Sequence, residues 1–283
     1  MTKRAKSRPV VLAITSDQHC GSTVALSPPT VALDDGGSYA ASKAQRWLWA
    51  CWTDYWQQVA EKRKALGADL YVVFNGDLTD GDHHGTTQIL SGNPVAQAAV
   101  VDACMKVPLR LEPDRLWFIR GTEAHVGKSG CYEERIASGL RKDGRPVVGC
   151  DETGNASHWH AKVDVQGVRF DFAHHGSVGT RPWTKPNATN NLAAAMFYDH
   201  AKDGIPHPHL AVRSHFHQWA DTYDAHPTRL VQIAAWQLAT AFIHRIAPGK
   251  LADVGGLIAT VQDGLLDVEK VQFKPDPTPT WHA

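Results

Sequence analysis

Five short apolar runs, each followed at once by residues able to bind a metal ion, constrain this chain more than any other feature. The runs are Val10–Thr15, Leu70–Phe74, Leu116–Ile119, Val168–Ala173 and Leu210–Val212. Short runs rich in β-branched and aromatic residues, bounded by glycine or polar residues, predict buried strands. Ligands of open α/β sheets bind outside the carboxyl ends of the strands, so the polar residues after the runs are expected to converge on one crevice.

Two segments between the first three runs have the periodicity of helices. Residues 41–66 place a stripe of apolar side chains near one face: Leu48, Trp52, Trp56, Val59 and Leu66. The tryptophans could be read as a stacking surface for bases, but their spacing favours a helix that faces the core. Residues 94–109 predict a second helix, which begins at Pro94 and ends near Pro108. This alternation of strand and helix indicates a βαβαβ half with parallel strands.

The second half of the chain has the pattern of hairpins. Runs 162–165 and 168–172 flank Gln166-Gly167, and runs 257–262 and 266–273 flank Asp263-Gly264. Residues 191–202 are rich in alanine and predict a helix. A parallel first half and an antiparallel second half would form two sheets packed face to face, with helices outside. The sequence has no internal repeat or low-complexity linker, so one domain over residues 1–283 is expected, with residues 1–8 and 274–283 as surface tails.

Charge and cysteine content exclude several classes of protein. Lys plus Arg and Asp plus Glu both total 29, so the balance gives no support for nucleic acid or a membrane surface as a partner. The five cysteines are scattered and lack any Cys-x-x-Cys spacing, which argues against a disulfide framework and fits a reducing cytosol. No run approaches the ~18 apolar residues of a membrane span, so a soluble, cytoplasmic protein is expected.

Several of the polar residues have the spacing of metal ligands. Asp17 and His19 are two positions apart, so in an extended segment they point the same way and can bind one ion. His215 and His217 have the same spacing, and neutral imidazole is a common metal ligand. Asp77 follows a glycine at the end of a run, and its two oxygens can bridge two cations. Alone, Asp77 would instead be read as a helix cap or turn residue.

Together, the order Asp-x-His, Gly-Asp, Gly-x-x-x-His, His-Gly and His-x-His resembles the calcineurin-like metallophosphoesterase family, over about Val11 to His217. The resemblance implies an α/β fold, a four-layer αββα sandwich of two mixed β-sheets flanked by helices, with a dinuclear metal centre. It implies the following ligands: Asp17, His19 and His217 for one ion, Asp77 as the bridge, and His175 and His215 for the second ion. His175 is preferred to the alternative, His174, because the family ligand usually stands directly before glycine.

The third motif departs from the family pattern. Where Gly-Asn-His followed by an acidic residue is expected, this chain has Gly121, Thr122, Glu123, Ala124 and His125. By position, Glu123 would replace the amide ligand of the second ion, and His125 would replace the substrate-facing histidine. The acidic partner of that histidine is absent, because valine follows it. Similar stretches look familiar from phosphoesterases encoded in bacteriophage genomes.

The resemblance implies a metal-dependent phosphoric ester hydrolase. The expected substrate is a small phosphodiester or nucleotide, cleaved by a hydroxide that bridges two divalent ions, with Asp77 and His125 as catalytic residues. Sites rich in histidine and carboxylate accept Mn, Ni, Fe, Co or Zn, and manganese is the expected ion. A phosphomonoesterase, a nuclease and a non-catalytic metal-binding scaffold remain open alternatives. A metal-dependent amidohydrolase barrel is disfavoured, because its His-x-His pair would follow the first strand.

The loop from Thr79 to Gly92 carries a further polar cluster. Asp80, Asp82, His83 and His84 follow the Gly-Asp motif closely. They could line a substrate entrance, but the sequence alone favours a solvated loop.

Overall fold

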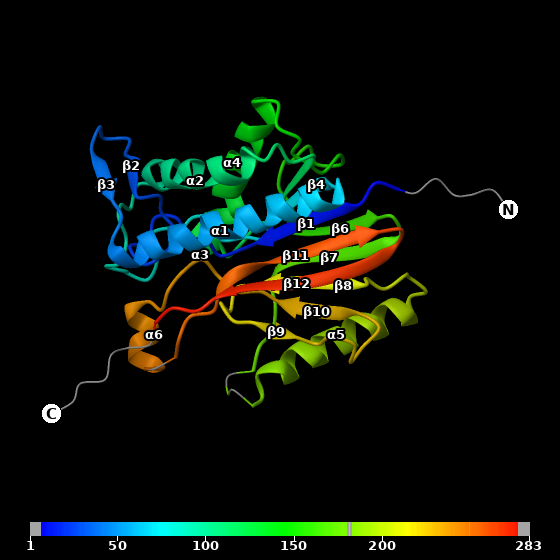
Figure 1. Ribbon diagram of the computed structural model, residues 1–283. Helices are drawn as coiled ribbons and strands as arrows, with labels where there is room; N and C mark the ends of the chain where they lie inside the picture. Colours follow the sequence, from blue (N-terminus) through cyan, green and yellow to red (C-terminus); the bar gives the residue numbers. More distant parts are fainter. Residues whose placement is uncertain (1–6, 180, 182, 249, 277–283) are drawn as a thin grey trace.

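Two five-stranded sheets lie face to face, with helices on their outer sides, in the computed structural model of this chain (Figure 1). The structure describes residues 7–179, 181, 183–248 and 250–276. The predicted surface tails, 1–8 and 274–283, therefore fall mostly outside the described residues, which exclude 1–6 and 277–283.

The first sheet has the strand order β12-β11-β1-β4-β5. Its strands are β1 (Val10–Thr15), β4 (Asp69–Phe74), β5 (Arg115–Phe118), β11 (Val254–Gln262) and β12 (Leu265–Phe273). β1, β4 and β5 are parallel, whereas β11 pairs antiparallel with both β1 and β12. The three parallel strands consequently end at the same edge of the sheet, and their polar motifs follow there.

The second sheet has the order β6-β7-β8-β10-β9. Its strands are β6 (His160–Val165), β7 (Val168–His175), β8 (Leu210–Ser214), β9 (Ala220–Asp221) and β10 (Arg229–Gln232). The β6–β7 hairpin is antiparallel as predicted, but β7, β8 and β10 are parallel to one another. The expectation of an antiparallel second half is therefore wrong at the centre of this sheet. A helix crosses between β7 and β8, and such a crossover joins parallel strands.

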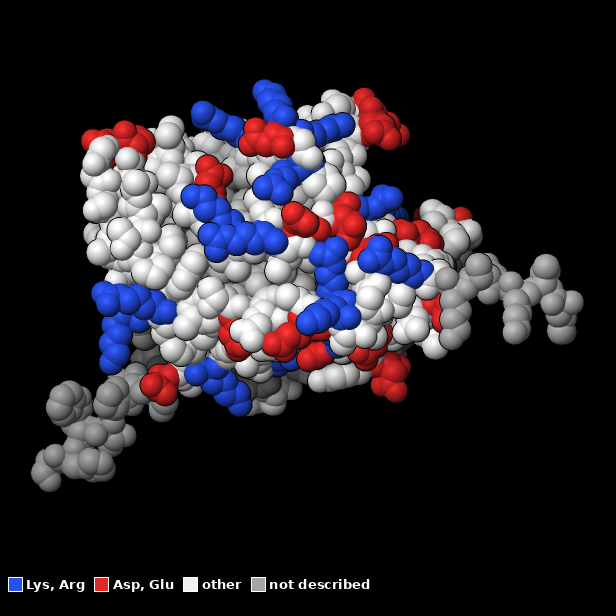
Figure 2. All heavy atoms as spheres, turned by 45° about the horizontal axis from the view of Figure 1, so that its top comes forward, with Lys and Arg blue, Asp and Glu red and all other residues white. Residues whose placement is uncertain are grey.

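Helices cover the outer faces of both sheets. On the first sheet lie α1 (Lys43–Leu66), α2 (Pro94–Leu109) and α4 (Cys131–Lys142), and on the second lies α5 (Lys185–Lys202) (Figure 1). The short elements are β2 (Thr30–Ala32), β3 (Ser38–Ala40), α3 (Glu123–Val126), a 3-10 turn at Lys128–Gly130 and α6 (Ala241–Ile246). Figure 2 shows basic and acidic side chains interspersed on the face that α1, α2 and α4 cover. Throughout the described residues, each helix is too short or too polar to span a bilayer.

The two predicted helices of the first half are confirmed. Ser42 caps α1 in a capping box with Gln45, and Gly67 ends the helix with a left-handed φ of 60°. Trp52 and Trp56 are each only 1% exposed, so the tryptophan stripe faces the core and offers no stacking surface to a base.

Two apolar layers hold the fold together, and β1 contributes to both. Val11 and Ala13 pack with the helices outside the first sheet, whereas Val10, Leu12 and Ile14 pack between the two sheets. Side chains of successive strand residues point to opposite faces, so a strand buried on both faces is apolar throughout. The resulting order of layers is helix, sheet, sheet, helix. The predicted four-layer αββα sandwich is confirmed.

Candidate metal centre

The loops beyond the strand ends hold candidate ligands in an unfavourable backbone conformation. Five of them have left-handed φ values: Asp17 (55°), His19 (45°), Asp77 (55°), His215 (77°) and His217 (51°). For a residue other than glycine this conformation costs roughly 1 kcal/mol or more, and it persists only where the surroundings impose it. Such a concentration of strained residues at one edge of the sandwich indicates a functional site.

Backbone hydrogen bonds fix the first two ligand loops against each other. The Asp17 N–H donates to the Gly76 carbonyl at 2.9 Å, and the His19 N–H donates to the Asp77 carbonyl at 3.0 Å. These bonds continue the parallel ladder of β1 and β4 beyond the ends of both strands. Behind them, the Trp236 N–H donates to the Asp17 carbonyl at 2.9 Å, which ties this loop to the second half of the chain.

Asp17, His19 and His217 form a first group, in which the potential ligand atoms all lie within 4.8 Å of one another. The His217 Nε2 lies 3.2 Å from the Asp17 Oδ1 and 3.1 Å from the His19 Nε2. Asp17 is fully buried, and its Oδ1 accepts no hydrogen bond from the residues that the structure describes. The structure thus brings together the three residues expected to share one ion.

Asp77, His174 and His215 form a second group within the same distance limit. The His174 Nε2 lies 3.0 Å from the Asp77 Oδ2. The same Oδ2 lies 4.0 Å from the His19 Nε2 of the first group. The other carboxylate oxygen of Asp77 accepts a hydrogen bond from the Thr122 N–H at 2.7 Å. Asp77 is therefore placed between the two groups, as a bridging carboxylate would be.

The hydrogen bonds of His19 and His174 determine which ring nitrogen faces the centre. The His19 Nδ1 donates to the Asp80 Oδ1 at 3.0 Å, and the His174 Nδ1 donates to the Asn75 carbonyl at 2.7 Å. In the neutral rings, each Nε2 therefore carries a lone pair directed at other acceptors. Buried acceptors that face one another need either a proton or a metal cation between them. The imidazole and carboxylate donors suit a divalent transition metal.

The centre also perturbs the pKa values of its members. Burial alone would lower the pKa of His19, but the nearby carboxylates of Asp17, Asp80 and Asp77 raise it to about 10. Burial likewise opposes protonation of His174, but Asp77 and Asp17 raise its pKa to about 10. His174 in turn holds the pKa of Asp17 well below its usual value, although burial would raise it. The centre therefore attracts positive charge strongly.

His174, and not the preferred His175, is the residue placed in the second group. β7 has a register shift between Phe172 and His175, so the alternation of side chains changes near its end. As a result, His174 is buried, while His175 is exposed and its Nε2 lies 3.3 Å from the Thr122 Oγ1. The choice of His175 is corrected accordingly. A bulge of this kind cannot be recognised from the sequence.

Glu123 does not lie where the replacement of the amide ligand would require it. Its carboxylate accepts a hydrogen bond from the Ser129 N–H at 3.0 Å, and the side chain is exposed. The helical turn α3 begins at Glu123 and directs this side chain away from the centre. Thr122 is closer to the second group instead, with its Oγ1 at 3.1 Å from the His215 Nδ1. The expectation for Glu123 is corrected on these grounds.

His125 stands beside the first group. Its ring centroid lies 4.6 Å from that of His19, and its ligand atom belongs to a further group with His19 and Asp77. Its Nδ1 donates to the Asp80 carbonyl at 2.7 Å, which leaves Nε2 free to face the centre. Burial and the neighbouring His19 lower the pKa of His125 to about 4, so the ring is neutral at physiological pH.

Two carboxyl groups that support the centre were not identified from the sequence. Asp80 is 2% exposed, and besides His19 it accepts a hydrogen bond from Gln237 Nε2 at 3.3 Å. Glu133, on α4, is fully buried and accepts from the N–H groups of Gly121 and Leu78 at 2.7 and 3.3 Å. Asp80 could have been found from its position just after the Gly-Asp motif. Glu133 belongs to no recognisable motif.

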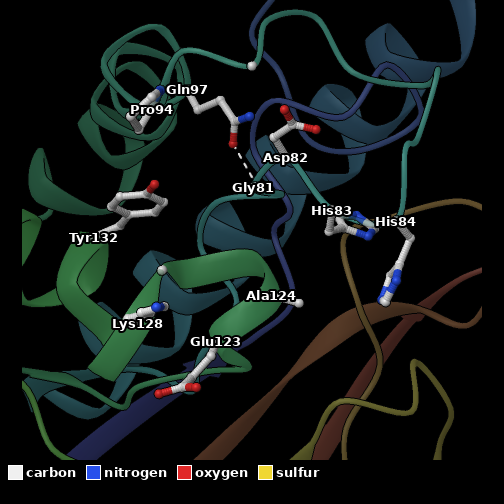
Figure 3. Close-up of a pocket in the computed structure, with 12 residues that line it drawn as sticks. Gly81, Asp82, His83, His84, Pro94, Gln97, Glu123, Ala124, Lys128 and Tyr132 are labelled. Carbon is white, nitrogen blue, oxygen red and sulfur yellow. Dashed lines mark hydrogen bonds between the residues drawn. The ribbon is translucent and has the colours of Figure 1, made fainter.

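A cavity of about 460 Å³ adjoins the centre (Figure 3). The residues that line it are Gly81, Asp82, His83, His84, Gly92, Pro94, Gln97, Glu123, Ala124, Gly127, Lys128 and Tyr132. The loop after Thr79 was expected to be solvated. In the structure Asp80 is buried, and the next three polar residues of the loop line this cavity. Asp82 and His84 are exposed, as expected of a solvated loop, and the same two residues border the cavity together with His83.

No protein-family model and no curated protein matches this chain. Among solved structures it is similar to Vps29 complexed with Zn²⁺ from Entamoeba histolytica, at 9% identity and a TM-score of 0.39, covering 93% of this chain and 98% of that chain. A hypothetical protein from Pyrococcus horikoshii has 11% identity and a TM-score of 0.45, with 94% and 89% covered. A dimetal phosphatase from Danio rerio has 8% identity and a TM-score of 0.38, with 93% and 98% covered. Similarities this low carry no argument about function, which must come from the site.

Proposed function

We propose that this chain is a calcineurin-like metallophosphoesterase, of the type encoded by bacteriophages, that hydrolyses small phosphodiesters with two divalent metal ions. One observation supports the proposal above all others. Two groups of buried and half-buried imidazole and carboxylate ligands adjoin at the Asp77 carboxylate: Asp17 with His19 and His217, and Asp77 with His174 and His215. Adjacent cation sites that share a carboxylate are typical of enzymes that hydrolyse phosphate esters.

The residues around the centre would have different roles in the reaction. Two divalent cations in such a centre supply Lewis acidity, which stabilises charge on the phosphoryl oxygens and activates water. Asp80 and Asn75 orient His19 and His174 by accepting their Nδ1–H groups. In its observed tautomer, His125 presents a lone pair at Nε2. It is therefore suited to accept a hydrogen bond from a water or hydroxyl group, and not to donate a proton to the leaving oxygen.

A small diester, such as a short or cyclic nucleotide, is the proposed substrate. A long polyanion would need a surface dominated by positive charge. The net charge of this chain is zero, and basic and acidic side chains are interspersed on the face seen in Figure 2. The five cysteines are free, which supports a location in the reducing cytoplasm. Mn²⁺ is the first ion to test, followed by Ni²⁺, Co²⁺, Fe²⁺ and Zn²⁺.

Replacement of the bridging carboxylate tests this function. Asp77→Asn removes the negative charge between the two groups while it preserves the size of the side chain. We expect turnover of bis-p-nitrophenyl phosphate by the Mn²⁺-loaded protein to fall more than roughly 100-fold, because loss of even a supporting residue of a metal site costs 10–100-fold. Asp54→Asn, on the exposed face of α1, is the matched control and should retain full activity.

Two results would count against the proposal. Near-wild-type rates in Asp77→Asn would show that the two groups do not form the catalytic centre. Bound metal without turnover of any mono- or diester by the wild-type protein would favour a metal-binding scaffold instead.

A further inference from the structure

The cavity lies next to the candidate metal centre. The His83 ring on its wall has its centroid 4.4 Å from that of His125, and the His125 ring is 4.6 Å from His19. Ala124, also on the wall, directly precedes His125 in the chain. If the phosphoryl group binds at the centre, as the proposed function requires, one of its ester substituents extends into this cavity.

Small residues create the space. Gly81, Gly92, Ala124 and Gly127 all contribute to the lining. Gly81 has a φ of 70°, and a Cβ there would lie 2.5 Å from the Ala124 carbonyl oxygen, so a larger residue would push the two walls apart. The volume of about 460 Å³ falls within the roughly 300–1,000 Å³ of pockets that bind small organic molecules.

Two polar side chains on the wall, Gln97 and Glu123, are already engaged. The Gln97 Oε1 accepts from the Gly81 N–H at 2.8 Å, and its Nε2 donates to the Ser91 carbonyl at 2.9 Å. The Glu123 carboxylate accepts from the Ser129 N–H and is turned away from the other lining residues in Figure 3. These groups hold the shape of the cavity and leave little capacity for a ligand.

Asp82 and Tyr132 are different. Within the part of the chain that the structure describes, no hydrogen bond or ion pair engages the carboxylate of the exposed Asp82 or the hydroxyl of the half-buried Tyr132. Figure 3 shows Tyr132 on the left of the cavity and Asp82 on the upper right, with the end of Gln97 between them, Pro94 above Tyr132 and Ala124 below Asp82. An aromatic side chain and a carboxylate acceptor therefore both border the cavity, from different sides.

We propose that this cavity binds the nucleoside part of the substrate, with the base stacked on Tyr132 and an exocyclic amino group donated to Asp82. A planar ring gains from the aromatic face, and an amino group satisfies the free acceptor. A second phosphate would be repelled by Asp82, and Lys128 is the single Lys or Arg among the lining residues. The inference rests on the proposed function and narrows it to diesters of one nucleoside, with preference for amino-bearing bases.

The test compares three substrates of the Mn²⁺-loaded protein. Cytidine and uridine 2′,3′-cyclic phosphates differ in the exocyclic amino group, and methyl p-nitrophenyl phosphate has no nucleoside. Tyr132→Leu should lower kcat/KM for both cyclic nucleotides roughly 5- to 100-fold, the range of a lost stacking contact. Its rate on methyl p-nitrophenyl phosphate should stay within about twofold of wild type, because the ester at the metal centre is unchanged.

Three further variants separate stacking and hydrogen bonding from general damage. Tyr132→Phe keeps the ring and should retain most of the nucleotide activity. Asp82→Ala should reduce the preference for cytidine over uridine to near unity. Tyr198→Leu, which removes an exposed tyrosine (69% exposed) on α5, is the matched control and should change no rate.

Binding to chelator-treated protein, measured by calorimetry with cytidine, gives a readout that does not depend on the metal ions. Cytidine binding that Tyr132→Leu abolishes would support the pocket even if the wild-type protein proved to have no esterase activity. The opposite result has three parts: methyl p-nitrophenyl phosphate is hydrolysed, cytidine does not bind, and wild type and Tyr132→Leu hydrolyse the nucleotides at equal rates. That result would overturn the inference and leave the proposed function intact.

Discussion

At the scale of single residues, two of the candidate ligands are oriented by hydrogen-bond acceptors that are not themselves members of the two ligand groups. His19 and His174 each donate their Nδ1–H to a fixed oxygen, of Asp80 and of the Asn75 backbone respectively. A carboxylate in this position fixes the ring orientation and increases the basicity of the opposite nitrogen. The Asp80 carboxylate is therefore part of the centre, although it follows the Gly-Asp motif in a loop that looked solvated.

Loss of the Asp80 carboxylate should weaken metal binding. In Asp80→Ala the His19 ring loses the acceptor that holds its tautomer, and supporting residues of this kind typically contribute 10–100-fold to metal affinity. We expect a loss in that range when Mn²⁺ binding is measured by competition with a chromophoric chelator. Asp199→Ala, at an exposed position on α5, should bind like wild type. Equal affinities in the two variants would exclude a supporting role for Asp80.

The two adjacent histidines at the end of β7 should differ sharply. His174 is buried against Asp77, whereas His175 is exposed. His174→Ala should therefore lower both metal content and diesterase turnover by more than roughly tenfold, while His175→Ala should change either by only a few-fold. Metal analysis and steady-state rates of both variants measure this contrast. A larger loss in His175→Ala would restore the assignment that the sequence favoured.

Sequence spacing identified most of the residues that the structure brings together, because the ends of apolar strands can be read directly. It could not distinguish His174 from His175, since that choice depends on a register shift that only strand pairing reveals. It also misplaced Glu123, because a single helical turn reverses the direction of a side chain. In both cases local backbone geometry, and not residue type, determines where the side chain lies.

At the scale of secondary-structure elements, the sequence predicted the strands and the two long helices of the first half well, because burial on both faces leaves continuous apolar runs. α4 was not predicted. Its apolar face is narrow, and the charged residues Glu133 and Glu134 stand in its first turn. The parallel pairing of β8 with β10 was also missed, since neither β9 nor β10 was predicted as a strand.

α4 supports the centre through Glu133, and this should make stability depend on pH. Burial, with the nearby Asp77, raises the pKa of Glu133 from 4.5 to about 8. Between these two values the folded protein binds a proton that the unfolded chain has released. Its stabilising contribution is therefore complete below about 4.5 and declines as the pH rises toward 8.

Urea unfolding of the chelator-treated protein at several pH values measures this effect. Wild-type stability should fall across the interval. Glu133→Gln, which cannot ionise, should flatten the dependence between about pH 4.5 and 6.5, below the range in which His19 and His174 contribute. The amide oxygen can replace the carboxylate oxygen that accepts the shorter bond, from the Gly121 N–H at 2.7 Å, and only the longer bond from the Leu78 N–H is lost, so the fold should persist. An unchanged slope in Glu133→Gln would assign the pH dependence to another group.

At the scale of the whole molecule, the candidate ligands join the two sheets. Asp17 and Asp77 follow strands of the first sheet, and His174 and His217 belong to the end of the second sheet and the loop beyond it. An ion bound by both sides would resist their separation. A ligand that binds the folded state alone stabilises it by about 2.7 kcal/mol at a concentration of 100 times its Kd.

Metal addition should consequently raise the melting temperature by several degrees, since about 1 kcal/mol corresponds to roughly 2–4 °C in a chain of this size. Thermal unfolding with Mn²⁺ and with excess chelator measures the shift. Asp17→Asn, which impairs the first group, should show a much smaller shift than wild type. A shift of equal size in that variant would mean that the ion binds elsewhere.

The strand order of the first sheet also limits when the site can form during synthesis. β1 lies between β4 and β11, so its second neighbour does not leave the ribosome until residues 254–262 have been made. His217 has likewise not yet been synthesised when the segment around Asp17 leaves the ribosome. Non-local pairing of this kind is slow, and a nascent chain exposes the unpaired edge of β1 until it is complete. An ion shared by Asp17, His19 and His217, as proposed, could therefore bind only after residue 217 has been made, and could not serve as a template for folding of the first half.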